Sequence, residues 1–160
     1  MRHLRAPVML ILGLALVAAL AASATAKTTK FTATYSGTVT EKVNGQTVTA
    51  TTKGNGKGTL IGKSTVSGIV TATTSDQACA PFGGPGSIVG TGGKMKVTVV
   101  NSRGCAASQD AQNDISVAGF VTVKGGTGKW KAAKANLHFT GHYDRGSGAF
   151  TVKLTGTLKY

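Results

Sequence analysis

The chain has 160 residues, with 18 Lys or Arg against 5 Asp or Glu, and its formal net charge is +13 at pH 7. This length fits one domain with a hydrophobic core rather than several domains. The basic balance suggests attraction to anionic partners, but Lys outnumbers Arg and aromatic residues make up only 6% of the chain, so no stacking platform for nucleic acid is expected.

The first 26 residues have the pattern of a secretory signal peptide. Arg2 and Arg5 precede an apolar run over residues 8–22, and small residues follow in "SATA" (23–26). We expect cleavage after Ala26, with Ala24 as an alternative site, and a single mature domain over residues 27–160. The apolar run is short for a membrane span, so we predict a secreted, extracellular protein with no stable membrane insertion after cleavage.

The two cysteines, Cys79 and Cys105, are interpretable once export is assumed. Outside the cell they most simply form one disulfide, with a free or catalytic thiol pair as the alternative. In the chain-entropy model, closing a loop of this length contributes about 3 kcal/mol of stability.

Apolar residues alternate with Thr and Lys along most of the mature chain, for example from Phe31 to Val39 and from Phe150 to Tyr160. This period of two predicts strands with one buried and one solvated face. Turn signals at Asn44–Gly45, 92–93 and 145–148 help to divide the chain. The expected strands cover 29–42, 46–60, 63–74, 86–91, 94–101, 114–124, 135–144 and 148–159. The second is the least secure, because "KGNGKG" (53–58) is a potential interruption.

Sequential strands with short turns favour an antiparallel up-and-down meander. Because eight is an even number, the first and last strands can pair antiparallel, which closes the sheet into a barrel without free edges. The predicted fold class is therefore an all-β, closed, eight-stranded barrel, and a two-sheet β-sandwich is the alternative. In this meander Cys79 (in connection 75–85) and Cys105 (in connection 102–113) lie at the same end of the barrel, where they can bond.

The charges are expected to segregate between the two ends. The five acidic residues fall at or beside the cysteine-bearing end, accompanied by Lys42, Arg103 and Arg145, whereas the other lysines lie elsewhere. The acidic residues are Glu41, Asp76, Asp110, Asp114 and Asp144. Four lysines form a basic patch around the sixth connection, namely Lys124, Lys129, Lys131 and Lys134.

Five glycines share the parity of the buried residues near the middle of their strands. They are Gly37, Gly68, Gly119, Gly141 and Gly156. An inward glycine allows a strand to coil sharply, as small closed barrels require, and it can also leave space in the lumen.

Two segments resemble those of secreted bacterial, actinobacterial-type proteins with an allene oxide cyclase-like barrel: "GGTGKWKAAKANLHFTGHYDRGSGAFTVKLTGTLKY" (125–160) and "GKGTLIGKSTVSGIVTAT" (56–73). The resemblance implies an eight-stranded barrel of the kind shared by allene oxide cyclases and dirigent proteins. It carries over no catalytic residue.

The expected lumen holds the candidate ligand-binding residues, which are Phe31, Tyr35, Val39, Phe139, Tyr143 and Phe150. An eight-stranded barrel encloses either packed side chains or one small ligand. Glu41 has inward parity and is the one acidic candidate for a lumenal general base, although a solvated charge at a strand end explains it as well.

His138 and His142 point outward on this alternation, about 13 Å apart on one strand, which is too far for one metal ion. We therefore expect no metal site and no cofactor.

From these features we expect a non-enzymatic secreted barrel. Its expected partner is a small apolar ligand in the lumen or an anionic cell-envelope polymer, and nucleic acid is not expected. The alternative is a lumenal isomerase or cyclase of the allene oxide cyclase type. Oligomerisation is compatible with either function.

Overall fold

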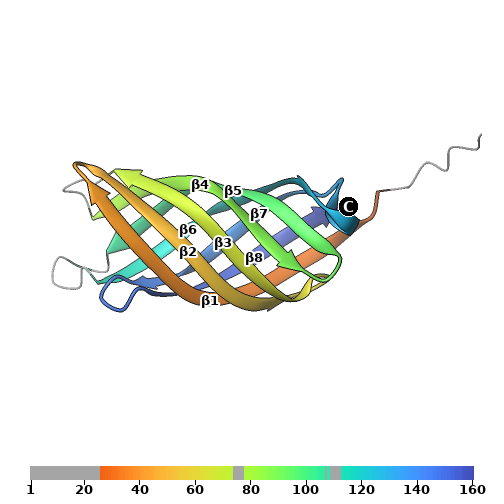
Figure 1. Cartoon of the computed structure of the whole chain (residues 1–160), viewed down its shortest axis with the longest axis horizontal. Helices are drawn as coiled ribbons and strands as arrows, with labels where there is room; N and C mark the ends of the chain where they lie inside the picture. Colours follow the sequence, from red (N-terminus) through yellow and green to blue (C-terminus); the bar gives the residue numbers. More distant parts are fainter. Residues whose placement is uncertain (1–25, 74–77, 107, 109–112) are drawn as a thin grey trace, which may run out of the picture.

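The computed structural model describes residues 26–73, 78–106, 108 and 113–160. Eight antiparallel strands pair in chain order, and β8 pairs with β1, so the sheet closes into a barrel (Figure 1). The predicted closed eight-stranded barrel is thus confirmed, and the sandwich is excluded. The elements are β1 (Thr28–Asn44), β2 (Thr47–Gly58), β3 (Gly62–Thr73), β4 (Cys79–Gly90), β5 (Gly93–Ala106), β6 (Asp114–Gly126), the 3-10 turn η1 (Gly128–Trp130), β7 (Lys134–Asp144) and β8 (Ala149–Lys159).

The alternation predicted from the sequence determines which side chains enter the barrel. Along β1, Phe31, Ala33 and Tyr35 are buried, whereas the two Thr residues between them are exposed. One core cluster fills the interior and draws on all of the strands except β2, whose inward positions include three glycines. In the described residues, no helix is long and apolar enough to cross a membrane.

The two ends of the barrel are closed to different degrees. At the tryptophan end, which carries η1 and lies at the right of Figure 1, Trp130, Ile61 and Leu158 are 0% exposed. The Trp130 Nε1–H donates to the carbonyl oxygen of Thr91 at 3.2 Å, and the chain beside it is tied down by backbone bonds between Lys27 and Tyr160. A buried indole with a satisfied N–H therefore plugs this end.

The opposite end, here called the disulfide end, carries the bonded pair Cys79–Cys105. The disulfide is confirmed, but the predicted positions of its cysteines in long connections were wrong. β4 begins at Cys79 and β5 continues to Ala106, so the two cysteines are direct cross-strand partners on adjacent strands.

The predicted connection 75–85 contains Pro81 and Pro85, which lie within β4 in the structure. Pro81 and Pro85 both pair with β5, and neither is among the residues that β3 pairs. A register shift between Phe82 and Gly84 absorbs the irregularity. A proline is tolerated where the ladder needs no donor from it, so the strand continues through both prolines.

"KGNGKG" does not interrupt β2, because its glycines face the interior beside large neighbours. A Cβ placed on Gly56 would lie 2.5 Å from Cδ1 of Tyr35, and one on Gly54 would lie 2.8 Å from Cζ of Phe150. The absence of side chains here makes room for two aromatic rings. Neither glycine belongs to the five for which inward parity was predicted.

Among the five glycines that were identified, Gly37 and Gly141 show the tightest contacts with a neighbouring strand. A Cβ on either would lie 2.1 Å from a carbonyl oxygen, that of Lys53 on β2 or that of Thr151 on β8. A side chain at these positions would force the strands apart. Gly68 and Gly119 are also at least half-buried, whereas Gly156 is exposed.

Candidate functional site

The six candidate lumen residues differ in how deeply they are buried. Phe31, Tyr35, Phe139 and Phe150 belong to the buried core cluster, and Val39 and Tyr143 pack against it while half-buried. The Tyr35 hydroxyl and the Ser64 Oγ are 3.0 Å apart, and burial raises the pKa of Tyr35. The candidate lumen residues therefore include two, Val39 and Tyr143, that are less buried than the others.

A polar group of three side chains occupies the mouth of the barrel at the disulfide end. The Glu41 side chain is 25% exposed, and its Oε2 lies 3.9 Å from Nε of Arg145. Burial raises the pKa of Tyr143 to about 12, with a further contribution from its hydrogen bond to the Glu41 carboxylate. Tyr143 thus stays a neutral donor at any physiological pH.

The β7–β8 turn that presents Arg145 is ordered by Asp144. Its Oδ1 accepts from the backbone N–H of Gly146 at 2.8 Å, and its Oδ2 accepts from the hydroxyl of Ser147 at 2.8 Å. These hydrogen bonds from Ser147 and Gly146 lower the pKa of Asp144. The turn and the strand end of β1 together place Glu41 and Arg145 side by side, a pairing that the sequence analysis did not identify.

The four lysines of the basic patch lie at the tryptophan end. Lys124 and Lys134 are direct cross-strand partners, and Lys134 is also the direct partner of Lys159. We call Lys124, Lys134 and Lys159 the lysine row. The Nζ of Lys129 lies over the Trp130 ring at 4.7 Å and over the Tyr160 ring at 5.0 Å, so this lysine is held against the plug.

The basic surface extends further around the tryptophan end than the four predicted lysines. Lys57 and Lys63 oppose each other directly between β2 and β3. Neither ion pair among the described residues involves a lysine. The described acidic residues, Glu41, Asp114 and Asp144, are at the disulfide end, and Asp76 and Asp110 lie outside the described residues.

Both histidines are exposed on the outer face of β7, in agreement with their parity. The His138 ring meets the Phe120 ring edge to face at 5.4 Å, and Nδ1 of His142 lies 3.6 Å from Oδ1 of Asp114. No group of three His, Cys, Asp or Glu residues that could hold a metal ion occurs in the described part of the chain.

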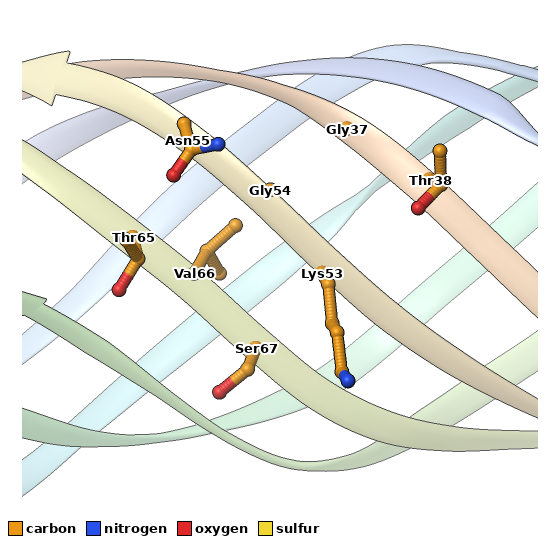
Figure 2. A pocket seen from close by; sticks show the side chains of 8 residues that line it. All are labelled: Gly37, Thr38, Lys53, Gly54, Asn55, Thr65, Val66 and Ser67. Carbon is orange, nitrogen blue, oxygen red and sulfur yellow. The ribbon is translucent and has the colours of Figure 1, made fainter.

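A hollow of about 520 Å³ lies over β1, β2 and β3. Figure 2 shows its polar side chains fanning out from the strands, while the main chain between them at Gly37 and Gly54 is bare. These two glycines are direct cross-strand partners. The remaining lining residues are Thr38, Lys53, Asn55, Thr65, Val66 and Ser67. With a single charged group on an open face, this hollow offers little to select a ligand.

Comparisons with protein-family models, with curated proteins and with solved structures found no match to this chain. The resemblance to allene oxide cyclase-like barrels therefore stays an expectation from the sequence.

Proposed function

We propose that the chain is exported and works as a non-enzymatic barrel that associates with an anionic polymer of the cell envelope through its tryptophan end. The proposal depends chiefly on the lysine row, in which three ammonium-bearing residues are aligned across β6, β7 and β8. The export step follows from the signal-peptide pattern, whose residues 1–25 lie outside the described part of the chain. The disulfide is compatible with an oxidising compartment.

The lysine row is expected to lower the stability of the folded barrel. Directly opposed residues of antiparallel strands have Cα atoms only about 4.5–5.5 Å apart, and like charges at such positions destabilise the sheet. No ion pair among the described residues neutralises these lysines. A polymer with closely spaced negative charges would supply the missing counter-charge, so the arrangement that disfavours folding would favour this partner.

The distribution of charge also gives the association a direction. The described acidic residues are at the disulfide end, and the plugged tryptophan end bears the lysine row together with several further lysines. These are Lys27, Lys30, Lys57, Lys63, Lys94, Lys129 and Lys131. A polyanion would be attracted more strongly to the tryptophan end than to the disulfide end, so the bound protein would present its disulfide end to solvent.

The test compares two triple variants that remove the same charge from different places. One replaces the lysine row with glutamine, and the matched control replaces Lys42, Lys53 and Lys153. Binding to polyphosphate is measured at ~20 mM and ~500 mM salt, because the Debye length falls from ~20 Å to ~4 Å over this range. We expect binding at low salt, loss at high salt, and an affinity at least ~10-fold lower for the lysine-row variant than for the control. Equal weakening by both variants would mean that net charge alone acts, which would overturn the proposed site.

The mouth of the barrel supports a second candidate function, the binding of a small apolar ligand. Val39, Tyr143 and Phe82 line the less buried half of the core cluster, and the ring of Phe82 lies 6.2 Å from that of Phe139. The hydroxyl of Tyr143 and the Glu41–Arg145 pair offer donors and an acceptor at the rim. Turnover in the same place, of the isomerase or cyclase type, would use Glu41 as the general base.

Native mass spectrometry of protein purified from its secretion medium tests this second candidate, because a retained ligand adds a defined mass. Loss of that mass in Val39→Trp, which fills the mouth, is the expected result. Turnover of an identified ligand that is unchanged in Glu41→Gln would exclude catalysis by this carboxylate.

A further inference from the structure

A second hollow, of about 420 Å³, lies on the outer face of β5, β6 and β7 near the disulfide end. It is at the opposite end of these strands from Lys124 and Lys134. The side chains that bear on its chemistry are Arg103, Cys105, Ser116, Ala118, Thr140 and His142.

Strand register gives this hollow the shape of a trough. Arg103, Ala118 and Thr140 are cross-strand partners in one row, and Cys105, Ser116 and His142 form the next row. The floor, on β6, thus consists of the two small residues Ser116 and Ala118. The larger side chains on β5 and β7 stand on either side of them as walls.

The side chains of the trough offer a cationic group, hydroxyl donors and an apolar edge. Arg103 is exposed and no described residue forms an ion pair with it, and the fork of a guanidinium group matches a planar oxyanion. The hydroxyls of Ser116 and Thr140 are additional donors. Because Nδ1 of His142 faces Asp114 at 3.6 Å, the Nε2 atom of His142 is left for a ligand. The Cys79–Cys105 disulfide contributes an apolar edge.

We propose that this trough binds a small organic carboxylate. The carboxylate group is held by Arg103 and the neighbouring hydroxyls, and the apolar body of the molecule lies over Ala118 and against the disulfide. A monoanion is favoured over a dianion such as phosphate, because Arg103 is the one Lys or Arg that lines the trough and Asp114 lies beside His142. This site is separate from the lysine row and from the barrel mouth.

The experiment uses benzoate as the probe and follows the backbone amide signals of the isotope-labelled mature chain by NMR. We expect saturable shifts concentrated at Arg103, Ser116 and Thr140. Benzyl alcohol, which has a similar ring but no charge, is expected to cause at least ~10-fold weaker effects, since hydrogen bonds to charged groups are the stronger ones. Inorganic phosphate serves as the dianion control and is expected to bind less well than benzoate.

Two variants test separately the charge of Arg103 and the shape of the floor at Ala118. Arg103→Gln should weaken benzoate binding at least ~10-fold, whereas Lys42→Gln, which removes another cation at the same end, should leave it unchanged. Ala118→Leu should abolish binding by filling the floor while leaving every charge in place. Shifts that persist in both Arg103→Gln and Ala118→Leu, or that are equal for benzoate and benzyl alcohol, would overturn the proposal.

Discussion

Replacing the central lysine of the lysine row should make the protein more stable. Lys134→Gln removes the charge that directly opposes two other lysines in the sheet, Lys124 on β6 and Lys159 on β8. Glutamine is close to lysine in length and is uncharged, so packing of the aliphatic part of the side chain is largely kept. The same substitution should weaken association with a polyanion.

The expected gain follows from the register. A direct cross-strand charge pair changes stability by about 0.2–1 kcal/mol. Lysine stems are flexible and let the ammonium groups splay apart, so the lower half of this range applies to each pair. Two pairs then give about 0.5–1 kcal/mol at low ionic strength, which corresponds to a Tm increase of about 2–5 °C for a domain of this size.

Thermal unfolding followed by circular dichroism at ~10 mM and ~1 M salt measures this effect. At ~1 M salt the Debye length is about 3 Å, shorter than the separation of the charges, and the gain should vanish. Lys153→Gln is the matched control, because Lys153 opposes Thr34 and Thr140 and has no charged cross-strand partner. A Tm for Lys134→Gln that is unchanged or lower at low salt, or a gain equal to that of Lys153→Gln, would refute the reasoning.

Three further predictions concern the disulfide, the mouth and a glycine. The double variant Cys79→Ser, Cys105→Ser should lose about 3 kcal/mol in urea unfolding, because it opens a covalent loop with a sequence separation of 26; a loss below ~1 kcal/mol would contradict this. Since the folded pKa of Tyr143 is raised to about 12, its contribution to stability is complete below pH 10 and is lost between pH 10 and 12. Urea unfolding of Tyr143→Phe between pH 9 and 11 should therefore show a smaller decline than the parent chain, and equal declines would count against the raised pKa. Gly56→Ala should cost about 1–3 kcal/mol, because its Cβ would lie 2.0 Å from the carbonyl oxygen of Thr34, whereas the exposed Asn55→Ala should stay within about 0.5 kcal/mol; equal losses would exclude the clash.

Local patterns in the sequence were sufficient for the topology. Alternation along β1 and β8 identified which residues enter the barrel, and short turn signals gave the number and order of the strands. Both signals are local, because they depend on the pleat of a strand and on the dihedral angles of a turn. Because the number of strands is even, the first and last strands can pair antiparallel, and this pairing closes the sheet into a barrel.

The strand limits of β4 and β5 could not be obtained in the same way. Whether Pro81 and Pro85 break a strand depends on whether the neighbouring strand needs a backbone N–H donor at these positions, and that is decided by the β3–β4 register. The same holds for the glycines of β2, since position 56 requires glycine because the Tyr35 ring and the Thr34 carbonyl of β1 occupy the space of a side chain. The type of residue indicates which backbone conformations a position can adopt. Whether the position needs a backbone donor or has room for a side chain depends on the neighbouring strand.

The sequence by itself determined the order of the strands, the inward and outward faces, and the separation of acidic and basic residues between the two ends. Only the tertiary structure determined which charged residues are neighbours across strands or turns. Lys124, Lys134 and Lys159 are aligned by the registers of two strand pairs, and Glu41 meets Arg145 only because the barrel closes. These contacts join residues distant in the chain, and their alignment depends on register, which no local preference of the chain specifies.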